Sequence, residues 1–131
     1  NWPSKKIQGY DQLPKSGKLL VITKSLKDVM CLYSCGITAC APNSENLFIS
    51  DAVLEELKSR FENIVVFYDN DRPGLYNMAK IRREHPELVY VCIPKECGSK
   101  DISDFYKDHG RKETLNLIKK FVLWLRDRRK T

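Results

Sequence analysis

The stretch VVFYDND, residues 65–71, joins an apolar run directly to two aspartates. Aspartate and asparagine are poor strand formers, so their position at the end of a β-favouring run needs a reason. One interpretation is structural, because Asp71 can cap a helix that Pro73 opens. The other is chemical, because Asp69 and Asp71 can hold a cation at the end of a buried strand. The rest of the chain bears on both interpretations.

Apolar runs alternate with helical patterns along the whole chain. Short apolar runs bounded by turn residues predict buried strands, and apolar residues three and four apart predict helices. The predicted strands are 18–23, 37–42, 63–68 and 88–94. The predicted helices are 25–36, 50–61, 73–84, 100–110 and 111–129. This alternation predicts an α/β fold, with a compact, mostly parallel four-stranded sheet flanked by helices and followed by a basic C-terminal helix.

The chain divides by composition into a lead-in, one domain and a basic end. Residues 1–17 contain two prolines and two glycines and predict an irregular lead-in, 18–110 form the predicted domain, and 111–131 the basic helix. The whole net charge of +6 arises in residues 107–131, which hold nine Lys/Arg against three Asp/Glu. Such an excess indicates either a nucleic-acid contact or a solvated helix face.

The first residue and the apolar runs bear on whether the chain is part of a longer protein and on where in the cell it lies. Asn1 rather than Met opens the chain, which favours a segment of a longer protein with further domains. No apolar run approaches membrane-spanning length and no signal-peptide pattern is visible, so we expect no membrane partner and a cytoplasmic location.

Five cysteines raise the question of a metal or redox site. An odd number without a secretion signal is typical of a reducing compartment. Cys31 and Cys35 lie four residues apart in a predicted helix, and Cys40 follows in a predicted strand. Since there is no CxxC pair and His85 and His109 are distant in sequence, buried apolar cysteines are favoured over a zinc site.

Acidic residues follow each of the four predicted strands. Ligands in parallel sheets bind beyond the carboxyl ends of the strands, so these residues are candidates for one site. They are Asp28, Glu45, Asp69, Asp71, Asp101 and Asp104. Like charges gathered there need neutralising, and a hard divalent cation such as Mg²⁺ does so with oxygen ligands. Each acid also has a structural interpretation as a helix cap, a first-turn acid or a solvent-facing charge. Glycine-rich dinucleotide and P-loop motifs are missing from the sequence, which excludes those nucleotide-binding classes.

Three segments in order resemble the Toprim family, most closely its DnaG-type and phage primase branch. They are LLVITKSLKDVMCLYSCGITACAPNSE (19–45), IVVFYDNDRPG with its DxD and Gly74 (64–74), and GSKDISDFYKDHG (98–110). The resemblance covers about residues 18–110. It implies a Toprim fold and Mg²⁺-dependent nucleotidyl transfer, with Mn²⁺ as a substitute, that makes RNA primers on a DNA template. It implies as partners the DNA template, ribonucleotides, and a replicative helicase or further domains of the parent protein. The setting it implies is a bacterial cytoplasm, or the host cytoplasm if a phage encodes the chain.

The resemblance also assigns roles to individual residues. The implied metal ligands are Asp28, Asp69, Asp71 and Asp101, with Asp104 as an alternative to Asp101. Asp28, Asp69 and Asp71 are predicted catalytic residues, and Lys24 and Glu45 are added to them as our own hypothesis rather than from the resemblance. The predicted contacts to phosphate or nucleic acid are Lys24, Arg72, Lys100, Lys119 and Arg126. Because such primases need neighbouring modules, we expect the isolated chain to make little or no primer.

The sequence departs from the family pattern at two adjacent positions. Lys24 and Ser25 stand where the family usually has Glu and Gly. Three interpretations stay open: Lys24 acts as an internal cation or grips a phosphate, Glu45 supplies the missing carboxylate, or the site is degenerate. The first two together are favoured because four other acids remain. The alternatives to a primase are a Toprim-type nuclease and a degenerate module that binds nucleic acid or a partner protein.

Overall fold

A computed structural model of the chain describes residues 7–43 and 48–130, without the side chains of 122 and 125–130. Its strands are β1 (Ile7–Gln8), β2 (Gly17–Thr23), β3 (Ala39–Pro42), β4 (Phe61–Phe67) and β5 (Val89–Val91). Its helices are α1 (Leu26–Ser34), α2 (Asp51–Arg60), α3 (Arg72–Glu84) and α4 (Ile102–Lys130), with short 3-10 turns η2 (Tyr10–Gln12) and η3 (Lys95–Cys97). The α/β alternation predicted from sequence is confirmed.

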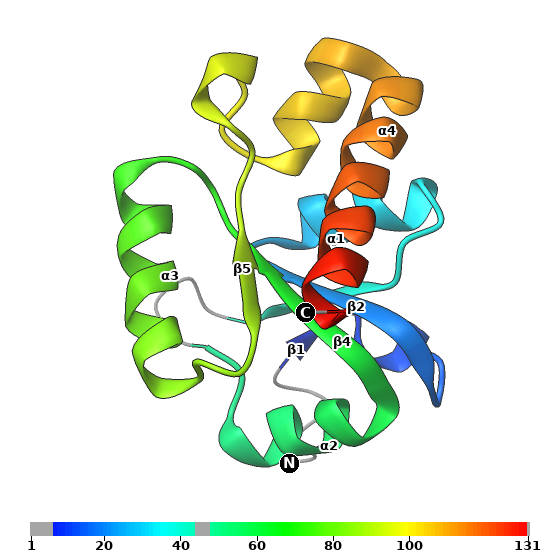
Figure 1. Ribbon diagram of the computed structural model, residues 1–131, viewed down its shortest axis with the longest axis vertical. Coiled ribbons are helices and arrows are strands. Elements are labelled where there is room, and N and C mark those ends of the chain that lie inside the picture. The colour runs from blue at the N-terminus through cyan, green and yellow to red at the C-terminus, as the bar shows by residue number, and fades with distance from the viewer. Residues whose placement is uncertain (1–6, 44–47, 131) are drawn as a thin grey trace.

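The sheet has five strands in the order β1-β3-β2-β4-β5. Figure 1 shows β2, β4 and β5 at the centre of the molecule. Strands β3, β2, β4 and β5 are parallel, as predicted, and β2 pairs with β4 along its whole length. The predicted count of four strands was too low, because β1 pairs antiparallel with β3. For Ile7 and Gln8 the prediction of an irregular lead-in was therefore wrong. A two-residue strand is too short to show a period in the sequence.

Strand β5 is shorter than the predicted strand 88–94. Its backbone leaves the sheet after Val91, and the carbonyl of Ile93 accepts a hydrogen bond from the Asn70 side chain at 2.7 Å. Pro94 follows and has no N–H to donate. The chain thus turns off the sheet toward the segment that leads into α4.

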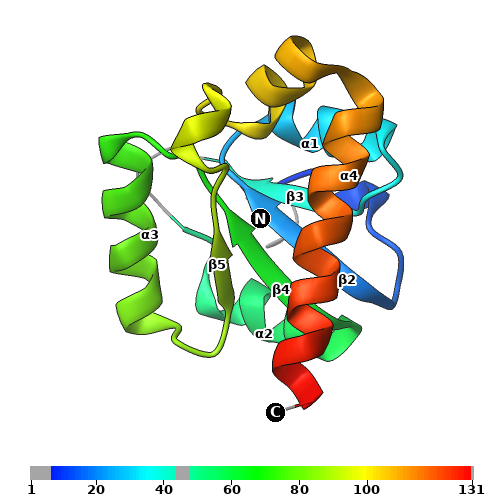
Figure 2. The same cartoon turned by 45° about the horizontal axis from the view of Figure 1, so that its top comes forward.

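Helices cover both faces of the sheet (Figures 1 and 2). On one face, α2 and α3 pack Leu54, Leu57 and Ile81 against strand residues that include Leu20 and Val66. On the other face, the core combines residues from α1, α4 and the alternate strand positions: Val29, Leu32, Ile102, Phe105, Ile118, Val21 and Phe67. Burial on both faces explains why the strands read as continuous apolar runs. No helix in the described part of the chain has the length and hydropathy needed to span a bilayer.

Helix α4 bends sharply at Gly110. The φ and ψ angles of this residue are 86° and 173°, which an L side chain rarely adopts, so glycine is required there. The predicted break between helices 100–110 and 111–129 corresponds to this bend. Beyond it, Ile118 and Phe121 pack on the sheet, and the Phe121 ring meets Phe67 edge-on at 5.5 Å between centroids. The helix runs back toward the amino ends of β2 and β4 (Figure 2).

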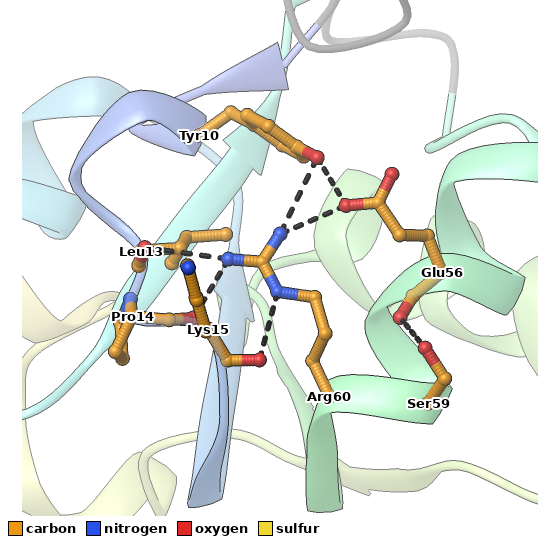
Figure 3. A network of polar contacts seen from close by, with 7 residues as sticks. All are labelled: Tyr10, Leu13, Pro14, Lys15, Glu56, Ser59 and Arg60. Atoms are coloured by element: carbon orange, nitrogen blue, oxygen red, sulfur yellow. Dashed lines mark hydrogen bonds and ion pairs between the residues drawn. The ribbon is translucent and has the colours of Figure 1, made fainter.

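Arg60 ties the lead-in to α2, as Figure 3 shows. Its guanidinium donates to the backbone carbonyls of Leu13, Pro14 and Lys15, at 3.3, 2.7 and 3.3 Å respectively. It also bonds the Glu56 carboxylate at 2.8 Å, and the Tyr10 hydroxyl donates to the same carboxylate. Planar, five-donor geometry suits arginine to bind several acceptors at once.

Gly74 allows α3 to start close against the end of β4. A Cβ at this position would lie 2.2 Å from the carbonyl oxygen of Asp69, well inside van der Waals contact. Asp71 caps the helix by accepting a hydrogen bond from the Gly74 N–H at 2.9 Å, and Pro73 occupies the first turn as predicted. The glycine in the DNDRPG segment is therefore set by sterics.

We expect Gly74→Ala to lower the free energy of unfolding by about 2 kcal/mol, because the new methyl group overlaps the backbone of Asp69. The direction of this change is informative, since a Gly→Ala substitution inside a helix ordinarily raises the free energy of unfolding. Urea denaturation monitored by circular dichroism measures the change, with Lys80→Ala on the exposed side of α3 as the control. Unchanged or increased stability of Gly74→Ala would contradict the steric argument.

Candidate metal centre

Three elements bring carboxylates to one point at the carboxyl edge of the sheet. Asp69 follows β4, Asp28 lies in the first turn of α1, and Asp101 directly precedes α4. One carboxylate oxygen from each lies within 4.8 Å of those of the other two. Asp28 and Asp69 are buried and Asp101 is half-buried. The structure thus brings together three of the predicted metal ligands, and we call them the acidic trio.

Asp28 is held in place through both of its carboxylate oxygens. The Thr23 hydroxyl donates to Oδ2 at 3.3 Å, and the backbone N–H of Ser103 donates to Oδ1 at 3.0 Å. Ser25 caps α1 by accepting from the Asp28 N–H at 3.3 Å. These bonds fix the end of β2, the start of α1 and the start of α4 relative to one another. The three carboxylates therefore cannot easily move apart.

Asp101 and Asp71 both act as helix caps, in agreement with the structural interpretation of each. The Asp101 carboxylate accepts from the Asp104 N–H at 2.8 Å and from the Ser103 hydroxyl at 3.0 Å. Asp101 nevertheless belongs to the trio, whereas Asp71 does not and is bonded to the Gly74 N–H instead. Asp104 lies in the first turn of α4. A role for Asp71 as a metal ligand stays a prediction.

The environment of the trio disfavours negative charge. Burial raises the pKa of Asp69 to about 6, and the charges of Asp101, Asp71 and Asp28 act in the same direction, while the Lys24 ammonium opposes them. Burial and the Asp101 charge also raise the pKa of Asp28, against the hydrogen bonds from Ser103 and Thr23. Carboxylates that are buried near one another without full compensation are typical of functional sites.

Lys24 is the cation nearest to the trio among the described ion pairs. Its Nζ lies 3.6 Å from Oδ2 of Asp69, and its side chain is 18% exposed. It occupies the junction between β2 and α1, one residue after the buried Thr23. The structure therefore brings Lys24, one of the two positions that depart from the family pattern, directly to the acidic trio.

Asn70, between the two aspartates, was missed by the sequence analysis. It is buried, and its side-chain amide donates to the carbonyls of Ile93 and Ser99 at 2.7 and 2.8 Å. Its backbone N–H donates to the Lys100 carbonyl at 2.8 Å. Three hydrogen bonds thus join the end of β4 to the segment that carries Asp101. The sequence signal was an asparagine just after an apolar strand, which does not reveal its distant backbone partners.

The remaining predicted residues lie in different places. Arg72 and Lys100 are exposed and adjoin Asp71 and Asp101 at the carboxyl edge. Lys119 is exposed on the part of α4 that runs away from this edge (Figure 2), and Arg126 lies further along the same part. The structure does not bring these two positions to the trio. Glu45, and the side chain of Arg126, fall outside the described residues.

The cysteines do not form a metal site among the described residues. The one cluster of metal-binding side chains found in that part of the chain is the acidic trio, which contains no cysteine. Cys35 and Cys40 are buried, and burial raises the pKa of Cys31 and Cys40 to about 12. Thiols of this kind are unreactive, in line with the expected role as small apolar residues.

The acidic trio fits a hard divalent cation by its donor set. Mg²⁺ and Mn²⁺ prefer carboxylate oxygens, and ligand oxygens on one octahedral ion with bonds of about 2.1 Å lie within about 4.2 Å of each other. One oxygen from each member of the trio lies within 4.8 Å of the others, so small side-chain movements would bring them onto one ion. A bound dication would also compensate the charges whose burial raises the pKa of Asp69.

Comparison with family models decides the family. The model described as Toprim-like matches residues 21–106, about two thirds of the chain, and this range includes every member of the acidic trio. The chain belongs to the Toprim-like family. A search of curated proteins found no match to it.

Two solved structures are similar to this Toprim-like chain in fold. The primase fragment of the bacteriophage T7 primase-helicase protein is 20% identical, with a TM-score of 0.59 over 81% of this chain and 45% of that one. The second belongs to a bacteriophage T7 assembly of lagging-strand DNA polymerase with primase domains of two gp4 subunits, an RNA/DNA hybrid and dTTP. It is 17% identical, with a TM-score of 0.52 over 79% of this chain and 54% of that one. This Toprim-like chain thus spans about half the length of each.

We expect Asn70→Ala to lower the free energy of unfolding of the Toprim-like chain by about 2–4 kcal/mol, because it leaves two buried carbonyls without a donor. Asn70→Asp keeps the shape but cannot donate, so it should be at least as destabilising. Hydrogen exchange at residues 95–101 should accelerate more than in the strands. Asn116→Ala on the exposed side of α4 is the control. Equal stability of Asn70→Ala and this control would rule out the proposed cross-link.

We expect Asp69→Asn to stabilise the metal-free Toprim-like chain at pH 7.5 by about 2 kcal/mol. The pKa of Asp69 is raised in the folded state, from its ordinary 3.8 to about 6, so its ionisation costs stability. The stability that Asp69 contributes is present below about pH 4 and is lost as the pH rises to about 6. The advantage of the variant should therefore shrink as the pH falls toward 4. Urea denaturation in chelator at several pH values tests this, with Asp11→Asn as the control. A pH-independent difference would contradict it.

Proposed function

We propose that this chain is the Toprim domain of a DNA primase or primase-helicase, taking part in the joining of ribonucleotides on a DNA template with Mg²⁺ or Mn²⁺. The observation that carries the proposal is the acidic trio of Asp28, Asp69 and Asp101 at the carboxyl edge of a Toprim-like sheet. Toprim domains generally depend on divalent metal ions. The similarity in fold to the T7 primase fragment supports a primase among the activities of this family.

The members of the trio would hold the cation, and each is pre-positioned by the fold. Hydrogen bonds from Thr23 and Ser103 orient Asp28, the α4 cap orients Asp101, and Asn70 fixes the strand end next to Asp69. When bound, the cation supplies positive charge that binds a triphosphate and stabilises charge developing on its phosphates. Rigid side chains of this kind favour catalysis by positioning, which dominates phosphoryl and nucleotidyl transfer.

Exposed cations beside the trio would bind the substrate phosphates. Arg72 and Lys100 adjoin the carboxyl edge, and side chains of this type commonly bind triphosphates and template backbones. In the proposed reaction, the 3′-hydroxyl of one nucleotide attacks the α-phosphorus of the next. A new phosphorus–oxygen bond forms as the bond to pyrophosphate breaks, and the hydroxyl proton passes to solvent. Catalytic roles for Asp71 and Glu45 are part of the same proposal.

A second candidate function is a module that binds nucleic acid without catalysis. The observation that favours it is the ion pair between Lys24 and Asp69, because an ammonium already compensates one of the buried carboxylates. Such a module would keep its nucleic-acid affinity when the trio is removed. A nuclease would use the same trio and is distinguished by its product.

We expect the wild-type chain to bind a fluorescent ribonucleoside triphosphate in Mg²⁺ or Mn²⁺, and chelator to abolish the binding. Asp69→Asn and Asp101→Asn should each lower the affinity at least about tenfold, since each removes a charged cation ligand from a half-buried site. Asp11→Asn, on an exposed carboxylate, is the matched control. Fluorescence anisotropy measures the affinity, and gel analysis of labelled template measures the product.

The outcomes separate the candidate functions. Cation-dependent nucleotide binding that requires the trio supports the primase proposal, and we expect little or no primer from the isolated chain. Shortened labelled DNA would instead indicate a nuclease. Nucleotide or DNA binding that is indifferent to chelator and to both trio variants would overturn the primase proposal in favour of the binding module.

A further inference from the structure

The position of Lys24 limits the number of divalent ions that the acidic trio can bind. Its ammonium lies 3.6 Å from Oδ2 of Asp69, and the lysine side chain is 18% exposed. Partly buried charges are screened by salt much less than exposed ones, so this ammonium acts strongly on anything bound to Asp69. It is also attached to the backbone between β2 and α1, so neither dilution nor a chelator removes it.

The formal charges of this cluster match a single dication. Asp28, Asp69 and Asp101 contribute three negative charges when ionised, and Lys24 contributes one positive charge, which leaves a net charge of −2. Asp71 lies outside the trio. The hydrogen bond that its carboxylate accepts from the Gly74 N–H, at the positive end of α3, offsets part of its charge. One divalent ion therefore neutralises the cluster, and a second would leave it with excess positive charge.

We propose that Lys24 is a built-in cation that limits this centre to one divalent ion. The inference deepens the proposed function and rests on it. In two-ion centres that act on phosphates, the ions lie about 3.5–4 Å apart and share ligands. A second ion that also bound Asp69 would lie close to the Lys24 ammonium and be repelled by it. Lys24 thus takes the electrostatic place of a second ion.

The same geometry predicts how the first ion binds. The ammonium competes with that ion for the carboxylate oxygens of Asp69. It also repels the ion across a half-buried cluster. Removing the charge of Lys24 while keeping its apolar stem should strengthen binding of the first ion. Replacing it by a carboxylate should add a ligand and open the centre to a second ion.

Titration of Mn²⁺ into the whole chain tests this, with bound ions counted by electron paramagnetic resonance and affinity measured by calorimetry. We expect one ion in the wild type, an affinity about tenfold higher in Lys24→Met, and two ions in Lys24→Glu. Lys27→Met removes the same charge from the exposed side of α1 and should behave as wild type. Thermal denaturation of each variant checks that it is folded, and the two substitutions at position 24 provide independent readouts.

Each outcome decides between the proposals. One ion in the wild type with the expected changes at position 24 supports the inference. Two ions in the wild type, or variants at position 24 with wild-type affinity and stoichiometry, would overturn it and leave the proposed function standing. Binding by Lys24→Met alone would also overturn it, in favour of a metal-free module. Binding by none of these proteins would overturn the inference and the metal-dependent function together.

Discussion

The side-chain amide of Asn70 is the interaction on which the geometry of the carboxyl edge depends. The acidic trio comes from three elements that are not continuous in sequence, and β5, the strand that leads toward Asp101, leaves the sheet after three residues. With so short a strand, sheet hydrogen bonds alone cannot position the segment before α4. The two bonds from the Asn70 amide, and a third from its backbone N–H, replace them. Because a neutral amide supplies the donors, the segment is held without adding charge to a crowded site.

The site concentrates unfavourable electrostatics in a fold that is otherwise regular. Buried carboxylates repel one another, and the Lys24 ammonium, the Thr23 hydroxyl and N–H donors at helix starts offset this repulsion in part. Active sites commonly retain such instability because binding of the ligand relieves it. The apolar packing on both faces of the sheet supplies the stability that this arrangement requires. The starts of α1, α3 and α4 meet at the trio, so their aligned N–H groups moderate the repulsion.

Much of the fold, but less of the site, was predictable from the sequence. Apolar runs and helical spacing identified the four parallel strands and the break at Gly110, because those signals are local. The part played by Asn70 was not predictable, since its partners are backbone carbonyls 23 and 29 residues away. Asp71 and Asp101 look alike in sequence as caps, yet only Asp101 belongs to the acidic trio. Such differences depend on side-chain direction, which residue type and spacing do not specify. Strand β1 escaped notice because two residues carry no period.

The bend at Gly110 has a practical consequence for attaching anything to this domain. After the bend, α4 crosses the sheet and ends near the amino ends of the strands, whereas the acidic trio lies at their carboxyl ends (Figures 1 and 2). A reporter or affinity tag fused beyond α4 would therefore emerge on the side opposite the candidate site and leave access to it open. Cutting the chain at Gly110 would instead remove Ile118 and Phe121 from the sheet, and the uncovered apolar face would promote aggregation.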